Sequence, residues 1–162
     1  MLIYSKKIIQ FANEIQFAVK NILAKEIRLK VFGSRFYNSK QTASFPIKVV
    51  IYNDRQMLGY FDRNFYELGF HERLMNGSRH QLHNVIRHEL AHYLTFINHG
   101  DIEDPHSNQF RAFCKEMGWG EEISRATLCL EEGVISPESQ ESPVLRKVKK
   151  LISLAFQLMT IL

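Results

Sequence analysis

The sequence has few of the residues that cross-link small proteins or build zinc ribbons. Its 162 residues include only two cysteines, four prolines and one tryptophan. Cys114 and Cys129 are too few for a disulfide framework, and they form no CxxC pair. We therefore expect two reduced thiols, as is typical of a cytoplasmic protein.

Long hydrophobic runs are also missing. The longest apolar stretch lies near the C-terminus and is too short to span a bilayer. At the N-terminus, Lys6 and Lys7 are followed by Gln10, Asn13 and Glu14 rather than by an uninterrupted apolar segment. This pattern is not that of a secretory signal, so we expect no membrane association and a cytoplasmic location.

The composition is otherwise that of one globular domain. Hydrophobic residues make up 45% of the chain and charged residues 23%, which is sufficient for a single core. The formal net charge is +4 and the pI is about 9.1. A mildly basic protein is compatible with an anionic partner, but this charge alone does not establish one.

Hydrophobic periodicity predicts an α+β fold. Helical spacing indicates an N-terminal helix, and alternating or β-branched segments indicate a small sheet of three or four strands. The expected elements are a helix over 5–26, strands over 27–37, 47–52, 57–61 and 65–73, and a loop over 39–46.

Two further helices follow the strands. Ser78 and Gln81 have the spacing of a capping box, and the periodicity continues to about residue 98, before Gly100. After an acidic loop, Asp104 as N-cap and Pro105 at the first helical position predict another helix, which ends near Gly118.

The first of these helices carries the HExxH pattern of His88, Glu89 and His92. Residues i and i+4 lie on one helical face, so both imidazoles can bind a single ion. Glu89 is rotated by about 100° around the helix and can address a water on that ion. Zn²⁺ lowers the pKa of such a water, and a carboxylate can then accept its proton.

A catalytic zinc needs a third protein ligand, for which the spacing leaves several candidates. His99 lies about 10 Å along the helix from His92, too far for a bond of about 2 Å. Glu103 or Asp104 would make a carboxylate site. His106 follows a loop long enough to return to the metal, at the start of the next predicted helix, and is favoured.

The segment HELAHYLTFINHGDIEDPHSNQF resembles the SprT-like zinc peptidase domain, which includes the Spartan proteases. The resemblance covers roughly residues 5–130. It implies a zincin-like fold and selects His106, followed four residues later by Phe110, as the third ligand beside His88 and His92. It also implies protein substrates, including proteins attached to DNA.

The chain differs from the family pattern in two places. The family often has glycine after its third histidine, where this chain has Ser107. Many bacterial members continue into a four-cysteine zinc ribbon, which this chain cannot form. We expect a peptidase domain over 1–130, a linker over 131–143 rich in Glu, Ser and Pro, and a basic amphipathic helix over 144–162 that resembles the start of a truncated helical domain.

The sequence therefore predicts a zinc metalloendopeptidase with Glu89 as general base and His88, His92 and His106 as ligands. Two alternatives remain at this point. The domain could be a zinc-stabilised binding module without activity, or a metal-dependent hydrolase of a non-peptide bond. Basic residues in 146–150 further predict weak, non-specific DNA binding. The oligomeric state is left open.

Other polar and aromatic residues are given structural roles. Each of the remaining histidines His71, His80 and His83 is expected to be an ordinary, partly exposed side chain. Tyr93 is considered as an oxyanion donor, although no spacing rule indicates it. Trp119 is expected to pack at the end of the last predicted helix of the peptidase domain.

Overall fold

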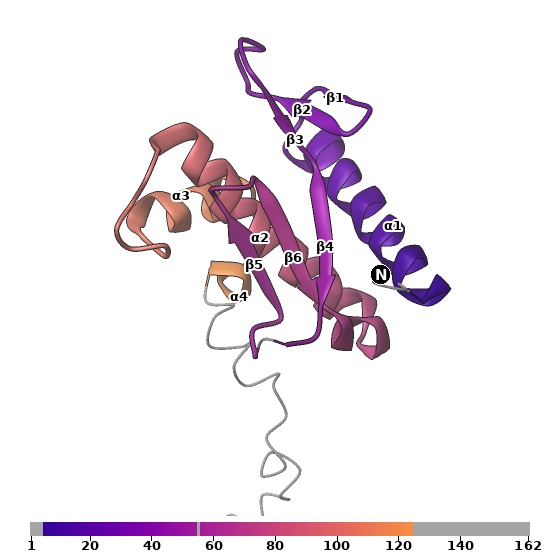
Figure 1. The fold of residues 1–162 in the computed structure, drawn as a ribbon. Helices are drawn as coiled ribbons and strands as arrows, with labels where there is room; N and C mark the ends of the chain where they lie inside the picture. The colour runs from indigo at the N-terminus through magenta and orange to yellow at the C-terminus, as the bar shows by residue number, and fades with distance from the viewer. Residues whose placement is uncertain (1–4, 55, 125–162) are drawn as a thin grey trace, which may run out of the picture. The chain divides into compact units, whose positions relative to one another are not determined.

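The computed structural model describes residues 5–54 and 56–124 (Figure 1). The chain begins with α1 (Lys6–Asn21), which continues as the π-helical turn η1 (Ile22–Glu26). The Ser5 hydroxyl caps α1 by accepting a hydrogen bond from the Ile8 N–H at 3.3 Å. This confirms the helix predicted over 5–26.

A small antiparallel sheet follows α1, with strand order β1-β2-β3. Its strands are β1 (Val31–Phe32), β2 (Arg35–Tyr37) and β3 (Ser44–Pro46). The single strand predicted over 27–37 is wrong, because the chain reverses at Gly33, whose φ of 58° favours glycine. The loop predicted over 39–46 is also partly wrong, since its end pairs with β2.

The second sheet contains β4 (Lys48–Tyr52), β5 (Gly59–Asp62) and β6 (Glu67–His71), in the order β4-β6-β5. These strands confirm the predictions over 47–52, 57–61 and 65–73, with shorter bounds for the last. β6 runs parallel to β4 and antiparallel to β5. β5 is therefore an edge strand of this sheet.

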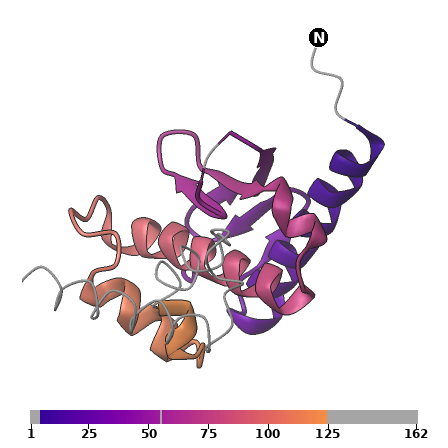
Figure 2. The same ribbon diagram turned by 90° about the horizontal axis from the view of Figure 1, so that it is seen from below.

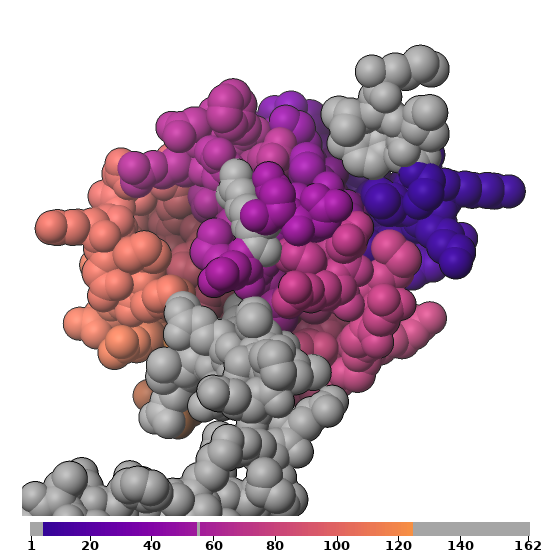
Figure 3. Space-filling view, turned by 60° about the horizontal axis from the view of Figure 1, so that its bottom comes forward, coloured from indigo at the N-terminus to yellow at the C-terminus, as the bar shows by residue number. Residues whose placement is uncertain are grey.

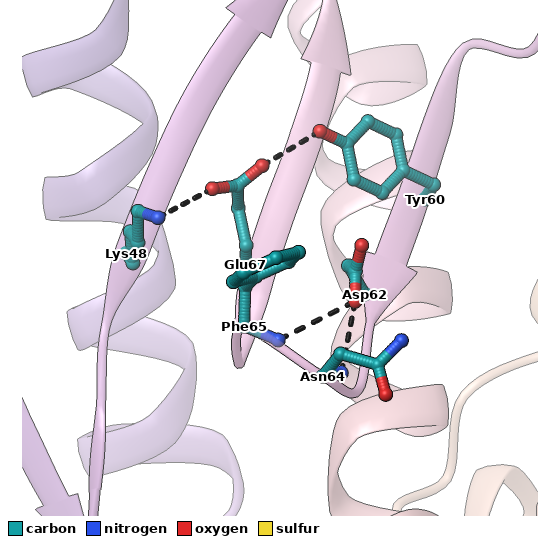
Figure 4. Close-up of polar contacts among 6 residues, drawn as sticks. All are labelled: Lys48, Tyr60, Asp62, Asn64, Phe65 and Glu67. Carbon is teal, nitrogen blue, oxygen red and sulfur yellow. Dashed lines mark hydrogen bonds and ion pairs between the residues drawn. The ribbon is translucent and has the colours of Figure 1, made fainter.

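One face of the second sheet is polar, and its side chains join all three strands (Figure 4). Glu67 lies at the centre. Its carboxylate pairs with the Lys48 ammonium at 2.7 Å and accepts a hydrogen bond from the Tyr60 hydroxyl at 2.8 Å. In the turn between β5 and β6, the Asp62 carboxylate accepts a hydrogen bond from the Asn64 N–H. Through Glu67, these contacts link β6 to both β4 and the edge strand β5.

The opposite face of the sheet packs on the central helix α2 (Arg79–His99), which follows the 3-10 turn η2 (Glu72–Asn76). Leu68 and Phe70 of β6 are fully buried there. Tyr93 of α2 is also fully buried, and its hydroxyl donates to the Pro46 carbonyl at 2.8 Å. Tyr93 therefore holds α2 to the N-terminal sheet and is occupied in the core, not free as an oxyanion donor.

Two short helices, α3 (Asn108–Glu116) and α4 (Glu121–Ser124), pack on the other side of α2 (Figure 2). They form a smaller apolar cluster of Ala91, Phe110, Cys114 and Ile123. In the space-filling view the salmon-coloured atoms around α3 and the indigo atoms of α1 lie at opposite sides of the described domain (Figure 3). α2 is thus the element that both parts of the core share.

The Glu26 carboxylate, at the end of η1, links the N-terminal helix to α2 and to the segment before α4. The Glu26 carboxylate accepts two hydrogen bonds from the Arg87 guanidinium, at 3.0 and 2.9 Å, and one from the Trp119 indole N–H at 2.9 Å. The hydrogen bond from Arg87 is the main cause that lowers the pKa of Glu26. Trp119 also packs against Phe113 of α3, as expected from the sequence.

The described residues confirm an α+β fold, with two small sheets in place of the single one expected. None of the helices described is long and apolar enough to cross a membrane. Cys114 is a buried, free thiol. The linker predicted over 131–143, the basic helix predicted over 144–162 and Cys129 lie outside the described residues.

Candidate metal centre

Two of the predicted ligands, His88 and His92, lie on α2. The helix begins where predicted, because the Ser78 hydroxyl accepts a hydrogen bond from the Gln81 N–H at 3.1 Å. It ends at Gly100, which has a φ of 75°. His88 and His92 are one helical turn apart, on the side of α2 that meets α3 and α4.

The third predicted ligand, His106, lies in a turn before α3. The helix expected to begin at Pro105, with Asp104 as its N-cap, begins instead at Asn108, with Ser107 as its N-cap. The Asp104 carboxylate accepts from the His106 N–H at 3.0 Å, and the Asp104 carbonyl accepts from the Ser107 N–H. Asp104 thus closes a local turn around His106 rather than capping a helix.

Phe110 gives the three imidazoles a common packing surface. Its ring is stacked on His92 with a centroid distance of 4.5 Å and meets His88 and His106 edge-on at 5.2 Å each. Phe110 is fully buried on the first turn of α3. The aromatic residue four positions after the third histidine therefore restricts the orientation of all three rings.

The geometry of the three imidazoles fits a single metal ion. The Nε2 atom of His88 lies 3.1 Å from that of His92 and 3.3 Å from that of His106. All three candidate ligand atoms lie within 4.8 Å of one another. Two nitrogens bound to one tetrahedral zinc at about 2.0–2.1 Å would lie roughly 3.3–3.4 Å apart. His88, His92 and His106 could therefore hold such an ion.

Backbone carbonyls orient two of the imidazoles. The His88 Nδ1 atom lies 2.8 Å from the Ile123 carbonyl of α4, which can only accept, so Nδ1 carries the proton. His92 makes a hydrogen bond to the backbone of Pro105, which has no N–H and must accept as well. In His88 this leaves the Nε2 lone pair free for a metal. The sequence analysis missed Ile123, because a backbone carbonyl leaves no side-chain signal.

Burial keeps the imidazoles neutral. Desolvation lowers the pKa of His88 to about 4 and that of His92 to about 3, and it also lowers the pKa of His106. A neutral imidazole is the form that binds metal, so no proton needs to be displaced at neutral pH.

Glu89 lies beside this cluster without belonging to it. Glu89 is only 3% exposed, and burial raises the pKa of its carboxyl to about 8. The nearest strand is the edge strand β5, where Gly59 faces the Glu89 carboxylate. The motif thus places a buried, protonatable carboxyl one residue from the first imidazole.

The other ligand candidates do not join the three-histidine cluster. His99, Glu103 and Asp104 are exposed, and none of them belongs to a metal-ligand cluster within the described part of the chain. His71 was expected to be partly exposed, which is wrong. It is 3% exposed, and its Nδ1 accepts a hydrogen bond from the Arg73 N–H at 3.0 Å.

The sequence of residues 11–128 matches the model of the SprT-like family. The chain belongs to the SprT-like family. The match includes α2, the turn that carries His106, and α3 and α4, so it covers the whole three-histidine cluster. The family suggests a metallopeptidase-like domain. No curated protein and no solved structure matches the chain.

Proposed function

We propose that this SprT-like domain is a zinc-dependent endopeptidase of zincin-like architecture. The observation that carries the proposal is the convergence of three neutral imidazoles, from His88, His92 and His106, beside the buried Glu89. Three histidines leave one position of a tetrahedral zinc open, as catalytic sites do and closed structural sites do not.

Each residue of the site has a distinct role in this proposal. The three imidazoles bind the ion and fix its position. When bound, zinc would polarise the substrate carbonyl and lower the pKa of a water molecule. Glu89 accepts a proton from the attacking water and delivers it to the nitrogen of the leaving amine. The C–O bond forms first, as the water adds to the carbonyl carbon, and the peptide C–N bond breaks when the amine nitrogen receives the proton.

The environment of Glu89 supports its assignment as the group that transfers this proton. Burial raises the pKa of the Glu89 carboxyl above that of an exposed carboxylate, so its ionised form binds a proton more strongly. Glu89 is also held within a long, capped helix, which limits its freedom. A carboxyl with these properties can both accept and release a proton under ordinary conditions.

The substrate class in this proposal is folded or unfolded protein, including protein associated with DNA. The family membership supports a protein substrate cleaved at its peptide bonds. The formal net charge of +4 is compatible with work near an anionic polymer. A binding module that holds zinc but lacks activity would use the same three ligands, so the deciding observation is hydrolysis itself.

Glu89→Gln is the variant that tests the proposal. We expect it to retain zinc, because Glu89 is not a ligand, and to lose casein hydrolysis by about two to four orders of magnitude. Zinc content by atomic absorption and initial rates on casein would be measured on the full chain. Glu103→Gln, at an exposed acidic position of the loop after α2, is the matched control and should retain full activity.

Two results would reject the assignment. Undiminished hydrolysis in Glu89→Gln would remove Glu89 as the general base. Zinc-loaded wild-type protein that cleaves neither native nor denatured casein would reject the peptidase assignment and leave the two alternatives, a binding module or a hydrolase of a non-peptide bond.

A further inference from the structure

The edge strand β5 begins at a glycine that lies directly against Glu89. A Cβ atom added to Gly59 would lie 2.7 Å from the Glu89 Oε1 atom and 2.8 Å from its Cγ. It would also lie 2.8 Å from the Val85 Cγ1 atom, one turn earlier on α2. Distances below 3.0 Å are not tolerated by real Cβ atoms, so a side chain at position 59 must displace something.

Backbone pairing holds the strand around Gly59 in the sheet. It pairs with Phe70 in the antiparallel ladder between β5 and β6, and the His71 N–H donates to the neighbouring Leu58 carbonyl at 3.0 Å. Leu58 is itself in the core, 4% exposed. Gly59 does not have a positive φ, so the need for glycine here is one of space rather than of backbone conformation.

We propose that Gly59 is a positioning residue for Glu89. Because Gly59 has no side chain, the backbone of β5 packs directly against the Glu89 carboxylate and determines its position. This inference rests on the proposed function, in which Glu89 transfers the proton. None of the three nearest atoms to the missing Cβ belongs to a histidine. A methyl group at position 59 would therefore displace the base and leave the metal ligands in place.

Gly69 of β6 provides the matched control. A Cβ there would lie 1.9 Å from the Tyr60 ring, which covers Gly69 on the opposite, polar face of the same sheet. Gly59 and Gly69 are both buried strand glycines with no room for a methyl group. Only Gly59 faces Glu89. Gly69→Ala therefore measures the effect of replacing a buried strand glycine at a position that does not contact Glu89.

The first arm of the experiment measures hydrolysis by zinc-saturated full chain. We expect Gly59→Ala to keep its zinc and to lower kcat by about a hundredfold, because a shift of about 1 Å at a reacting group has that effect. KM should change much less, since substrate contacts are not removed. Gly69→Ala should lower the unfolding midpoint and should lower kcat far less than Gly59→Ala does.

A double variant separates the two contacts of the missing Cβ. Val85→Ala removes the Cγ1 atom that the methyl group would meet, so Gly59→Ala/Val85→Ala restores space between strand and helix but not at the carboxylate. We expect the double variant to fold, to bind zinc and to remain as slow as Gly59→Ala. Recovery of kcat to that of Val85→Ala alone would show that strand spacing, not Glu89, is the sensitive contact, and would overturn the inference.

The second arm requires no substrate. Glu89→Ala removes both atoms of Glu89 that the new methyl group would meet. In a double-mutant cycle by urea unfolding, Gly59→Ala should lower the midpoint in the wild-type background and lower it much less in the Glu89→Ala background. Equal shifts in both backgrounds would mean that the methyl group does not meet Glu89, and the inference would fall.

The two arms distinguish this inference from the proposed function. If the wild type fails to cleave casein, the peptidase proposal fails, while the cycle still reports whether Gly59 sets the position of Glu89. If Gly59→Ala hydrolyses casein at the wild-type rate, the positioning role fails, while Glu89→Gln still tests the general base. Should Gly59→Ala alone not fold, the double variant with Val85→Ala carries the kinetic comparison.

Discussion

His106 is the residue that turns two neighbouring imidazoles on α2 into a candidate metal centre with three ligands. It lies in a turn closed by Asp104, and its Nε2 atom is 3.3 Å from that of His88. Phe110 packs against its ring and against the two helical imidazoles. Without His106, two helical histidines would remain, and these offer only part of a catalytic coordination sphere.

The ligand assignment predicts that His106→Ala weakens zinc binding strongly. Loss of an outer hydrogen-bond partner typically lowers metal affinity about 10–100-fold, and loss of a ligand should exceed this. Competition with a chromophoric chelator would measure the affinity. His99→Ala is the control, because His99 is the exposed last residue of α2 and should not affect the metal. Metal loss in His99→Ala with retention in His106→Ala would contradict the ligand set.

At the scale of elements, α2 is held in place from both of its sides. The sheet packs against it through buried residues such as Phe70, and α4 reaches it through the bond between His88 and the Ile123 carbonyl. Glu26 at the end of η1 adds a polar link to Arg87 on α2 and to Trp119 before α4. This carboxylate therefore connects the N-terminal helix to the helix that carries the motif.

The Glu26 link predicts a stability difference that depends on pH. Because its pKa is lowered in the folded protein, the ionised form stabilises the fold above the ordinary pKa of 4.5, and this contribution is lost as pH falls through the folded value. Glu26→Gln should therefore lower the free energy of unfolding by roughly 1 kcal/mol at pH 7, allowing for solvent screening. The difference from wild type should shrink towards pH 3.

Urea unfolding of both proteins between pH 7 and pH 3 would measure this effect. Glu116→Gln, at an exposed position on the last turn of α3, is the matched control and should unfold like the wild type throughout. A constant difference between Glu26→Gln and wild type over this range would show that the contact does not depend on the charge of Glu26.

At the scale of the whole molecule, net charge is the property that affects binding to an anionic polymer such as DNA. The chain carries 21 Lys and Arg residues against 17 Asp and Glu residues, which gives the formal net charge of +4. Four of the basic residues are Arg146, Lys147, Lys149 and Lys150. Basic side chains attract phosphates through charge, and contacts of that kind carry no sequence information.

We predict weak, sequence-independent DNA binding that weakens as salt rises. Three or four phosphate contacts would give a slope of log affinity against log salt of about −3. Fluorescence anisotropy with two unrelated duplexes over a salt series would measure both properties. Replacing the four basic residues between 146 and 150 with Gln should flatten the slope. Absence of binding at low salt, or binding that salt does not affect, would leave the positive charge as a solvated surface.

The sequence alone determined the features that depend on local spacing. Ser78 and Gly100 mark the ends of α2, and the four-residue interval between His88 and His92 is sufficient to place both on one helical face. The strands that became β4, β5 and β6 were also predictable, because their apolar and β-branched residues pack on a buried face. The matched family covers the same region of the chain.

Only the tertiary structure decided the contacts between distant parts of the chain. The capping rules placed a helix after Asp104, whereas α3 begins after Ser107, where Phe110 packs against the three imidazoles. The Ile123 carbonyl and Gly59 reach the site from α4 and from an edge strand, through backbone groups that have no side-chain pattern. Their positions follow from strand order and helix packing, which depend on the whole core rather than on neighbouring residues.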